Sequence, residues 1–236
     1  MIDVVEISKK VLERLCVMDY ERIGGSSDEQ LIFPKKIQGN GKRPKDRISE
    51  QELRQLFIEE FKLAYSSLFY SIETPTIKKY RFRDTNESVE AKKQSALHDM
   101  CVFEKVGNDF KRRLNIEFKY GNGAIGNTAK DIEKLICEEE NGVFIHLLKN
   151  TRRDTLCNEG KTGVFDKLYK SFLDNNGNWI DTNKSILLII ISLNQKTLIH
   201  REIKKGENFD SLFSFDDYKY GNIKEVNGNS WNKLIK

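Results

Sequence analysis

The sequence predicts an α/β protein in which a mixed β-sheet is flanked by helices. Amphipathic helices alternate with strands along the chain, in the order helix, three strands, helix, strand, helix, strand, strand. Two of the later strands, "GVFIHLL" at 142–148 and "SILLIIISL" at 185–193, are continuously apolar, which is typical of strands covered on both faces. A chain of 236 residues can bury one sizeable core, so we expect one main domain.

Composition narrows the class of protein. Hydrophobic residues make up 38% and charged residues 32% of the sequence, which is typical of a folded protein rather than of a disordered chain or a membrane protein. The net charge of +4 is small, so it permits a polyanionic partner without indicating one.

The cysteines and the apolar runs indicate the compartment. No CxxC pair and no zinc-like spacing to histidine occurs, so we expect reduced thiols at Cys16, Cys101, Cys137 and Cys157. The first residues, "MIDVVEISKK", lack the basic start and apolar core of a signal peptide. The longest apolar run, Ile186–Ile191, is too short to cross a bilayer. We therefore expect a cytoplasmic protein without a membrane partner.

The chain before residue 47 reads as a helix followed by a basic linker. Apolar residues recur at helical spacing over 3–19, which predicts a helix lying on the main core. The segment "PKKIQGNGKRPKDR" at 34–47 favours a flexible connection, because it is rich in Pro, Gly and basic residues. We expect three parts: the N-terminal helix and basic linker (1–46), the core (47–205) and a C-terminal extension packed on the core (206–236).

A second helix opens at Ser49, where "SEQE" forms a capping box between Ser49 and Glu52. Its apolar stripe consists of Leu53, Leu56, Phe57, Phe61, Ala64 and Leu68. At about 100° per residue, Glu60 falls in the middle of that stripe. A carboxylate on a buried face is costly unless it is paired, so Glu60 has either an ion-pair partner at the core edge or a bound cation.

Three strands follow, and two of them carry charges in unexpected places. The first of the three strands is "TIKKYRFR" at 76–83. The second and third, "SALHDMCVFE" and "RRLNIEFKY", lie on either side of a turn signal, which predicts an antiparallel hairpin. Asp99 is the odd member of an apolar row, and Glu117 and Lys119 share one face of the next strand. His98 lies on the opposite face from Asp99, so we expect a packed or surface histidine.

The remaining elements complete the sheet. A helix is predicted from Thr128, with Asp131 as the weak partner of a capping box. A further helix at 162–174 separates the two apolar strands, and "TLIHREI" at 197–203 predicts the last strand.

Three carboxylates and one lysine thus stand where apolar or neutral residues would be expected: Glu60, Asp99, Glu117 and Lys119. Neighbouring strands would bring Asp99 and Glu117 close together, and their repulsion would raise a pKa. A hard divalent cation such as Mg²⁺ is the natural compensator, and a lysine beside it can orient a water. The alternative is a structural ion pair between Asp99 and Lys119.

This pattern resembles the motif of the PD-(D/E)xK nuclease superfamily. Asp99 is followed, after 17 intervening residues, by Glu117-Phe118-Lys119 on the next strand. The resemblance covers roughly residues 47–195 and implies a restriction-endonuclease-like fold with an αβββαβ core. His98 stands where the motif has its proline, a position that many relatives also vary.

The resemblance implies a metal-dependent endonuclease that hydrolyses DNA, such as a restriction or defence nuclease. Asp99, Glu117 and the Phe118 carbonyl would hold Mg²⁺, for which Mn²⁺ can substitute, with Glu60 as a further ligand. Asp99, Glu117 and Lys119 would form the catalytic set, with Lys119 positioning the attacking water. Cutting two strands with one site per chain would suit a homodimer.

Two matters stay open at the level of sequence. The chain can also be a nuclease-fold module that has lost turnover and binds nucleic acid or scaffolds a complex. Basic clusters can track phosphates or simply form solvated faces, namely Lys79 with Arg81 and Arg83, Lys111–Arg113, and Arg152 with Arg153. Lys130 and Glu133 lie where a helix could support the site.

Overall fold

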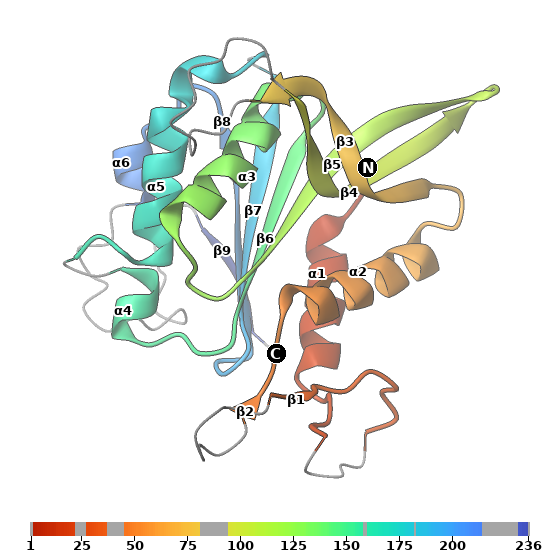
Figure 1. The fold of residues 1–236 in the computed structure, drawn as a ribbon, viewed down its shortest axis with the longest axis vertical. Coiled ribbons are helices and arrows are strands. Elements are labelled where there is room, and N and C mark those ends of the chain that lie inside the picture. The colour runs from red at the N-terminus through yellow and green to blue at the C-terminus, as the bar shows by residue number, and fades with distance from the viewer. Residues whose placement is uncertain are drawn as a thin grey trace.

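The core of the protein is a seven-stranded mixed sheet, whose strands are labelled β3 to β9 in Figure 1. The computed structural model describes residues 2–21, 27–36, 45–80, 94–157, 160–181, 183–213 and 231–235. The strands lie in the spatial order β3-β4-β5-β6-β7-β8-β9, which is also their order along the chain. Consecutive strands are therefore neighbours throughout the sheet.

The sheet is antiparallel at both sides and parallel in the middle. Its strands are β3 (Phe69–Tyr80), β4 (Gln94–Val106), β5 (Asp109–Tyr120), β6 (Gly142–Leu148), β7 (Ser185–Ser192), β8 (Thr197–Lys204) and β9 (Asn232–Ile235). β5, β6 and β7 run parallel to one another, and the other neighbours are antiparallel. The mixed α/β sheet predicted from the sequence is confirmed, with its order of helix, three strands, helix, strand.

Helices cover both faces of the sheet (Figure 1). α1 (Val4–Leu15) and α2 (Glu50–Ala64) lie on one face and share a hydrophobic core with β4, β5 and β6. On the other face lie α3 (Ile125–Cys137), α4 (Arg153–Leu156), α5 (Val164–Asp174), the short η1 (Asn176–Asn178) and α6 (Phe209–Phe213). β6 and β7 are buried on both sides, which explains their continuously apolar sequences.

The predicted hairpin between β4 and β5 is confirmed. Val106 pairs with Asp109 across a two-residue turn of Gly107 and Asn108. Gly107 has a φ of 63°, a left-handed conformation that favours glycine. The hairpin extends beyond the rest of the sheet in Figure 1.

Two element boundaries differ from the prediction. β3 starts at Phe69 rather than at residue 76, and it includes Pro75, which an edge strand tolerates. α3 starts at Ile125 rather than at Thr128, so Asp131 lies in its second turn and does not cap the helix. The predicted strand residues 81–83 lie outside the described part of the chain.

The segments on either side of the core also contain regular structure. Within the basic linker, β1 (Lys35–Lys36) and β2 (Lys45–Asp46) form a two-stranded ribbon, where only a flexible connection was expected. Within 206–236, α6 and Trp231 join the hydrophobic core, and β9 extends the sheet. Ring contacts between Trp231 and Phe165 tie this segment to α5.

Two further features concern the cysteines and the lengths of the helices. The four cysteines are free thiols. Within the described ranges, none of the helices combines the length and the apolar character that a membrane crossing requires.

Gly163, which precedes α5, gives the first testable prediction. A methyl group at this position would overlap the backbone carbonyl oxygen of Leu156. We expect Gly163→Ala to lower the free energy of unfolding by about 1–3 kcal/mol, the usual cost of overpacking, as measured by urea unfolding. The matched control is Gly177→Ala, because a methyl group there would meet nothing within 4 Å. Equal stability of the two variants would contradict the expected steric overlap with the Leu156 carbonyl.

Candidate functional site

The candidate site lies where β4 and β5 move apart. The pairing of β4 with β5 ends at Met100 and Ile116. Asp99, the residue just before Met100 in β4, lies beyond this last pair. Beyond that pair, Asp99 Oδ2 accepts the Phe118 backbone N–H at 2.7 Å, so a carboxylate stands where a backbone carbonyl would otherwise bond. Burial raises the pKa of Asp99, and the hydrogen bond from Phe118 opposes the rise. The Asp99 carboxylate is therefore held between β4 and β5 at the point where the two strands diverge.

Glu117 lies beside Asp99 and is almost completely buried. Its Oε1 lies 2.5 Å from His98 Nδ1, and its Oε2 accepts from Lys134 Nζ at 2.7 Å. Burial raises the pKa of Glu117 well above its ordinary value, and the Lys134 ammonium opposes that rise. Burial alone would lower the pKa of Lys134, but Glu117 and Asp131 outweigh it and raise the pKa.

His98 contacts Glu117, whereas the sequence placed it on the opposite strand face from Asp99 and gave it no partner in the site. The side chain is fully buried, as a packed histidine would be. Burial lowers the pKa of His98 to about 3, so its ring is neutral. A carboxylate only accepts hydrogen bonds, so with Glu117 ionised the proton lies on Nδ1 of His98.

Lys119 and α3 close the site from the other side. Lys119 Nζ donates to Asp131 Oδ2 at 2.6 Å, and Lys134 Nζ lies 3.1 Å from Asp131 Oδ1. Lys134 also donates to the Leu97 carbonyl at 2.8 Å, which ties α3 to the start of β4. The supporting positions on α3 are thus Asp131 and Lys134, each one residue beyond the Lys130 and Glu133 suggested by the sequence.

The structure does not bring Glu60 to this site. Glu60 Oε1 lies 3.2 Å from Arg14 Nη1 of α1, and the same guanidinium binds Glu29 and Glu59. The buried face was predicted correctly, but the ion-pair alternative applies, because α1 covers that part of α2. Ten residues separate Glu60 from the first residue of α2, which is about 15 Å along a helix axis.

Glu50, at the first position of α2, takes the place that the sequence assigned to Glu60. Burial raises the pKa of Glu50 to about 7; the Asp99 carboxylate adds to the rise and the Lys119 ammonium opposes it. Among the residues that the structure describes, no hydrogen-bond or ion-pair partner contacts its carboxylate. A half-buried carboxylate without a partner, beside other carboxylates, is the most distinctive feature of the site.

We call this set the carboxylate–lysine cluster; its members are Glu50, Asp99, Glu117, Lys119, Asp131 and Lys134. With every group ionised, four carboxylates face two lysines, which leaves two excess negative charges. The sequence placed Asp99, Glu117 and Lys119 together, and the structure agrees. The signal for Glu50 was present, because the phase of α2 sets it on the same apolar stripe as Leu53.

Phe118 links the cluster to the core. Its ring is buried and packs edge-on against Phe57 of α2, with centroids 5.3 Å apart. The N–H and C=O of one residue in an extended strand point to the same side. Since the Phe118 N–H faces Asp99, its carbonyl also faces the gap between β4 and β5.

The donor chemistry of the cluster fits a hard divalent cation. Its ligating atoms are oxygens, its carboxylates raise one another's pKa, and with every group ionised its charge is negative, which a bound cation would offset. The ligands are not already assembled: no three His, Cys, Asp or Glu side chains in the described ranges converge closely enough to hold an ion. Lys119 and Lys134 instead neutralise part of the charge.

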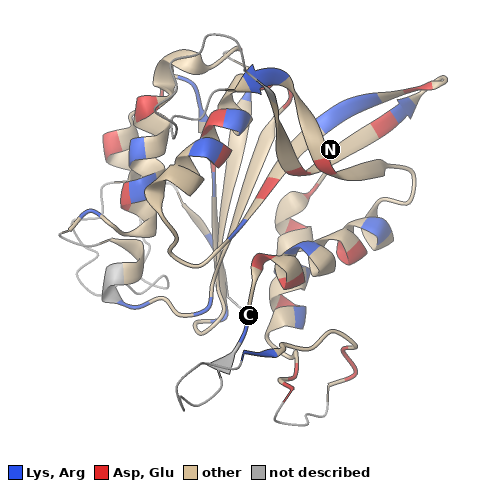
Figure 2. Ribbon diagram, viewed as in Figure 1, with Lys and Arg blue, Asp and Glu red and all other residues tan. Residues whose placement is uncertain are grey.

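The basic clusters suggested by the sequence are not equivalent. Arg112 is bound to Glu138 and to the Pro75 carbonyl, so it is structural. Lys79, Lys111 and Arg152 are exposed. Arg81, Arg83 and the Arg153 side chain lie outside the described part of the structure. Figure 2 shows basic and acidic segments alternating along the β4–β5 hairpin and along α3, without one continuous basic face in that view.

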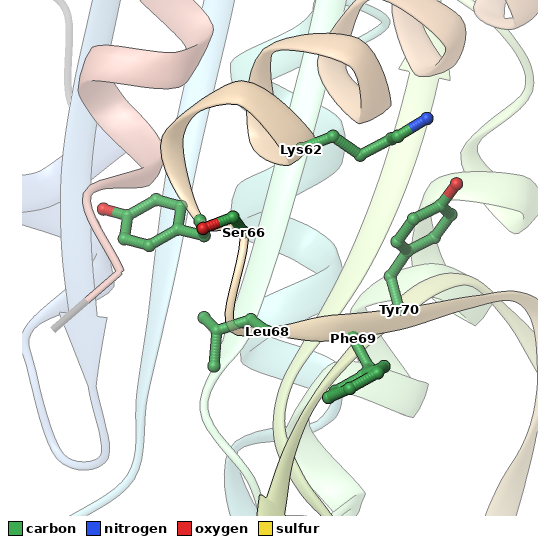
Figure 3. Close-up of a pocket in the computed structure, with 6 residues that line it drawn as sticks. Lys62, Ser66, Leu68, Phe69 and Tyr70 are labelled. Atoms are coloured by element: carbon green, nitrogen blue, oxygen red, sulfur yellow. The ribbon is translucent and has the colours of Figure 1, made fainter.

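A separate pocket of about 390 Å³ lies between the end of α2 and the start of β3. It is lined by Lys62, Tyr65, Ser66, Leu68, Phe69 and Tyr70. In Figure 3 the polar ends of Lys62 and Tyr70 are directed to the same side of this pocket. It contains no carboxylate and lies at the opposite end of α2 from Glu50, so it is not part of the carboxylate–lysine cluster.

The fold and the site together define a mixed α/β protein with a carboxylate–lysine cluster between two diverging strands. Comparisons with protein-family models, with curated proteins and with solved structures found no match for this chain. Its function is therefore argued from the geometry of the site.

Proposed function

We propose that the protein is a metal-dependent endonuclease that hydrolyses phosphodiester bonds in DNA. The observation that carries this proposal is the crowding of four carboxylates against two lysines where β4 and β5 diverge. An acidic, partly buried oxygen site with a lysine at its edge suits phosphodiester hydrolysis with a divalent cation. A role in restriction or defence would use the same chemistry.

The topology supports a restriction-endonuclease-like assignment. α2, β3, β4, β5, α3 and β6 follow one another in the αβββαβ order that the resemblance implies. Asp99, Glu117 and Lys119 lie at the corresponding strands and meet in one cluster. Glu50 replaces Glu60 as the carboxylate contributed by the first helix of that core.

Each residue of the cluster has a role in this proposal. Asp99, Glu117, Glu50 and the Phe118 carbonyl hold Mg²⁺ or Mn²⁺; Glu117 keeps free lone pairs although it accepts two hydrogen bonds. The bound cation would polarise the phosphodiester and stabilise the charge that develops on it. Lys119 holds the attacking water, and Asp131 fixes the direction of the Lys119 ammonium.

A second candidate function is a nucleic-acid-binding module of the same fold without turnover. It is favoured by one observation: both oxygens of Glu117 are already engaged, by His98 and by Lys134. Cleavage of DNA separates the two candidates. Incubation of plasmid DNA with the protein in Mg²⁺ should convert it to nicked or linear forms, and EDTA should prevent this.

Metal binding tests the ligand assignment independently of cleavage. We expect Glu50→Gln to weaken Mn²⁺ binding in a calorimetric titration by about tenfold or more, because a carboxylate ligand is lost. The matched control is Glu60→Gln on the same helix, which should leave Mn²⁺ affinity unchanged because Glu60 is bound to Arg14. Equal affinities for both variants would contradict the assignment of Glu50.

A homodimer would supply the two centres that cutting both strands requires, and it belongs to the same proposal. Sedimentation with and without a DNA duplex would show whether a second copy joins on the substrate.

A further inference from the structure

Arg54 lies at the edge of the carboxylate–lysine cluster, one turn after Glu50 on α2. Residues four apart on a helix are neighbours on the same face, and the Arg54 charge acts on the Glu50 carboxyl. Arg54 Nη1 donates to Glu73 Oε1 at 2.7 Å, and Nη2 donates to Gln51 Oε1 at 2.6 Å. The guanidinium is thus held in a fixed direction beside Glu50.

Glu73 approaches Arg54 from β3. Ile72 pairs with Met100 and Thr74 pairs with His98, so Glu73 stands opposite Asp99 on the neighbouring strand. Its φ is 48°, a left-handed conformation that costs a residue with a side chain about 1–2 kcal/mol. Strain of this kind persists where the surrounding structure enforces it, and it often marks a functional position. The strained residue thus places a carboxylate against Arg54 and near Asp99.

The ion pair between Arg54 and Glu73 lies at the surface on the Glu73 side. The Glu73 side chain is 52% exposed and the Arg54 side chain 18% exposed, and ion pairs between exposed groups contribute about 0–1 kcal/mol. Glu73 engages Arg54 through Nη1 alone, because Nη2 donates to Gln51, and a phosphate oxygen can accept from the same Nη1. A phosphate could therefore take the place of the Glu73 carboxylate on Arg54.

Electrostatics give a reason for such an exchange. With every group ionised, the carboxylate–lysine cluster carries excess negative charge, and Glu73 adds another negative charge near Asp99. Before a cation binds, a phosphate approaching these carboxylates is repelled unless a cationic side chain receives it. Arg54 is the guanidinium that borders both Glu50 and Glu73.

We propose that Arg54 binds a backbone phosphate of the nucleic acid substrate, and that Glu73 holds the guanidinium in the free protein until the phosphate displaces it. This inference rests on the nuclease function proposed above and assigns the residue that receives the substrate backbone at that site. Arg54 contacts substrate, whereas Glu73 sets the position of Arg54 and weakens unproductive binding.

The test measures binding rather than turnover. A short DNA duplex is titrated with full-length Lys119→Ala protein in Mg²⁺ at several salt concentrations, so that cleavage does not interfere. Adding Arg54→Ala should weaken binding by about tenfold and lower the slope of log Kd against log salt by about one, because one phosphate contact is lost. Adding Glu73→Gln should tighten binding, and this gain should shrink when Arg54 is alanine.

Two further variants separate phosphate binding from a structural role. Arg54→Lys should keep the salt slope but recover only part of the affinity, since lysine lacks the guanidinium fork. Lys62→Ala removes one positive charge from the same helix, about 12 Å further along, and should leave affinity and slope unchanged.

The outcomes distinguish this inference from the proposed function. An unchanged salt slope in Arg54→Ala, or no measurable binding by the parent protein, would overturn the role of Arg54. Absence of cleavage by the wild-type protein in Mg²⁺ or Mn²⁺ would overturn the nuclease function, and the binding series would still decide whether Arg54 receives a phosphate.

Discussion

Replacing Lys134 with methionine is expected to lower the free energy of unfolding by about 3–5 kcal/mol at neutral pH, the usual cost of leaving a buried charge without its partner. Lys134 Nζ lies 2.7 Å from Glu117 Oε2, and both side chains are buried. Methionine fills a similar volume, so the loss reports the missing ammonium rather than a cavity. Urea unfolding monitored by fluorescence measures the effect.

The same variant should become relatively less stable as pH rises. Burial raises the pKa of Glu117, and removal of Lys134 raises it further, so folded protein keeps a proton that unfolded protein has released. Stability therefore falls from about pH 4.5, the ordinary value for glutamate, up to the folded pKa. The difference between wild type and Lys134→Met should be smaller at pH 5 than at pH 8.

Two controls sharpen this result. Lys134→Met combined with Glu117→Gln should recover much of the lost stability and flatten the pH dependence, because neither member of this buried pair then carries a charge. Lys170→Met, at an exposed position on α5, should change stability little. A Lys134→Met protein as stable as the wild type at pH 8 would show that the ion pair does not hold α3 against β5.

Replacing Lys119 with alanine is expected to reduce Mg²⁺-dependent DNA cleavage by about 10²–10⁴-fold, the range for loss of a group that handles a proton or positions water. Lys119 donates to Asp131 at 2.6 Å, and its side chain is 18% exposed, so it is both oriented and accessible. Steady-state cleavage of a labelled duplex gives the rate. The loss should appear in kcat more than in KM.

The control for this experiment is Lys170→Ala, which removes a lysine remote from the cluster. The Lys119→Ala protein should remain folded, because Asp131 keeps its contact with Lys134. Undiminished cleavage in Lys119→Ala, with loss in Asp99→Asn, would assign the water-positioning role to another residue. Undiminished cleavage in both would remove the cluster from the mechanism.

Elements with a strong periodic pattern were predicted well from the sequence. α1, α2 and the apolar strands β6 and β7 follow the 3.6-residue or continuous patterns that burial imposes. The start of β3 was missed because its residues before Pro75 are mostly exposed and carry no alternation. β9 was missed because a four-residue edge strand has too little sequence to show a period.

The site was predictable where its residues are linked by local pairing. Asp99, Glu117 and Lys119 lie on one hairpin, so their spacing alone brings them together. Glu60 and Glu50 both lie on the apolar stripe of α2, and only the position of α1 decides which one meets an arginine. Asp131 was read as a capping residue because three residues of α3 precede the predicted start.

The left-handed turn at Glu73 has a further consequence for how the protein behaves at high concentration. β3 forms one edge of the sheet and exposes four large apolar side chains: Phe69, Tyr70, Ile72 and Ile77. An exposed apolar edge strand can pair with a strand of another molecule, which leads to aggregation. The kinked backbone, Pro75 and the register shift that follows it interrupt a flat edge. The Glu138 carboxylate also accepts the N–H groups of Ile77 and Lys78, at 2.8 and 2.9 Å. These two backbone N–H donors of β3 are therefore not available to pair with a strand from another molecule.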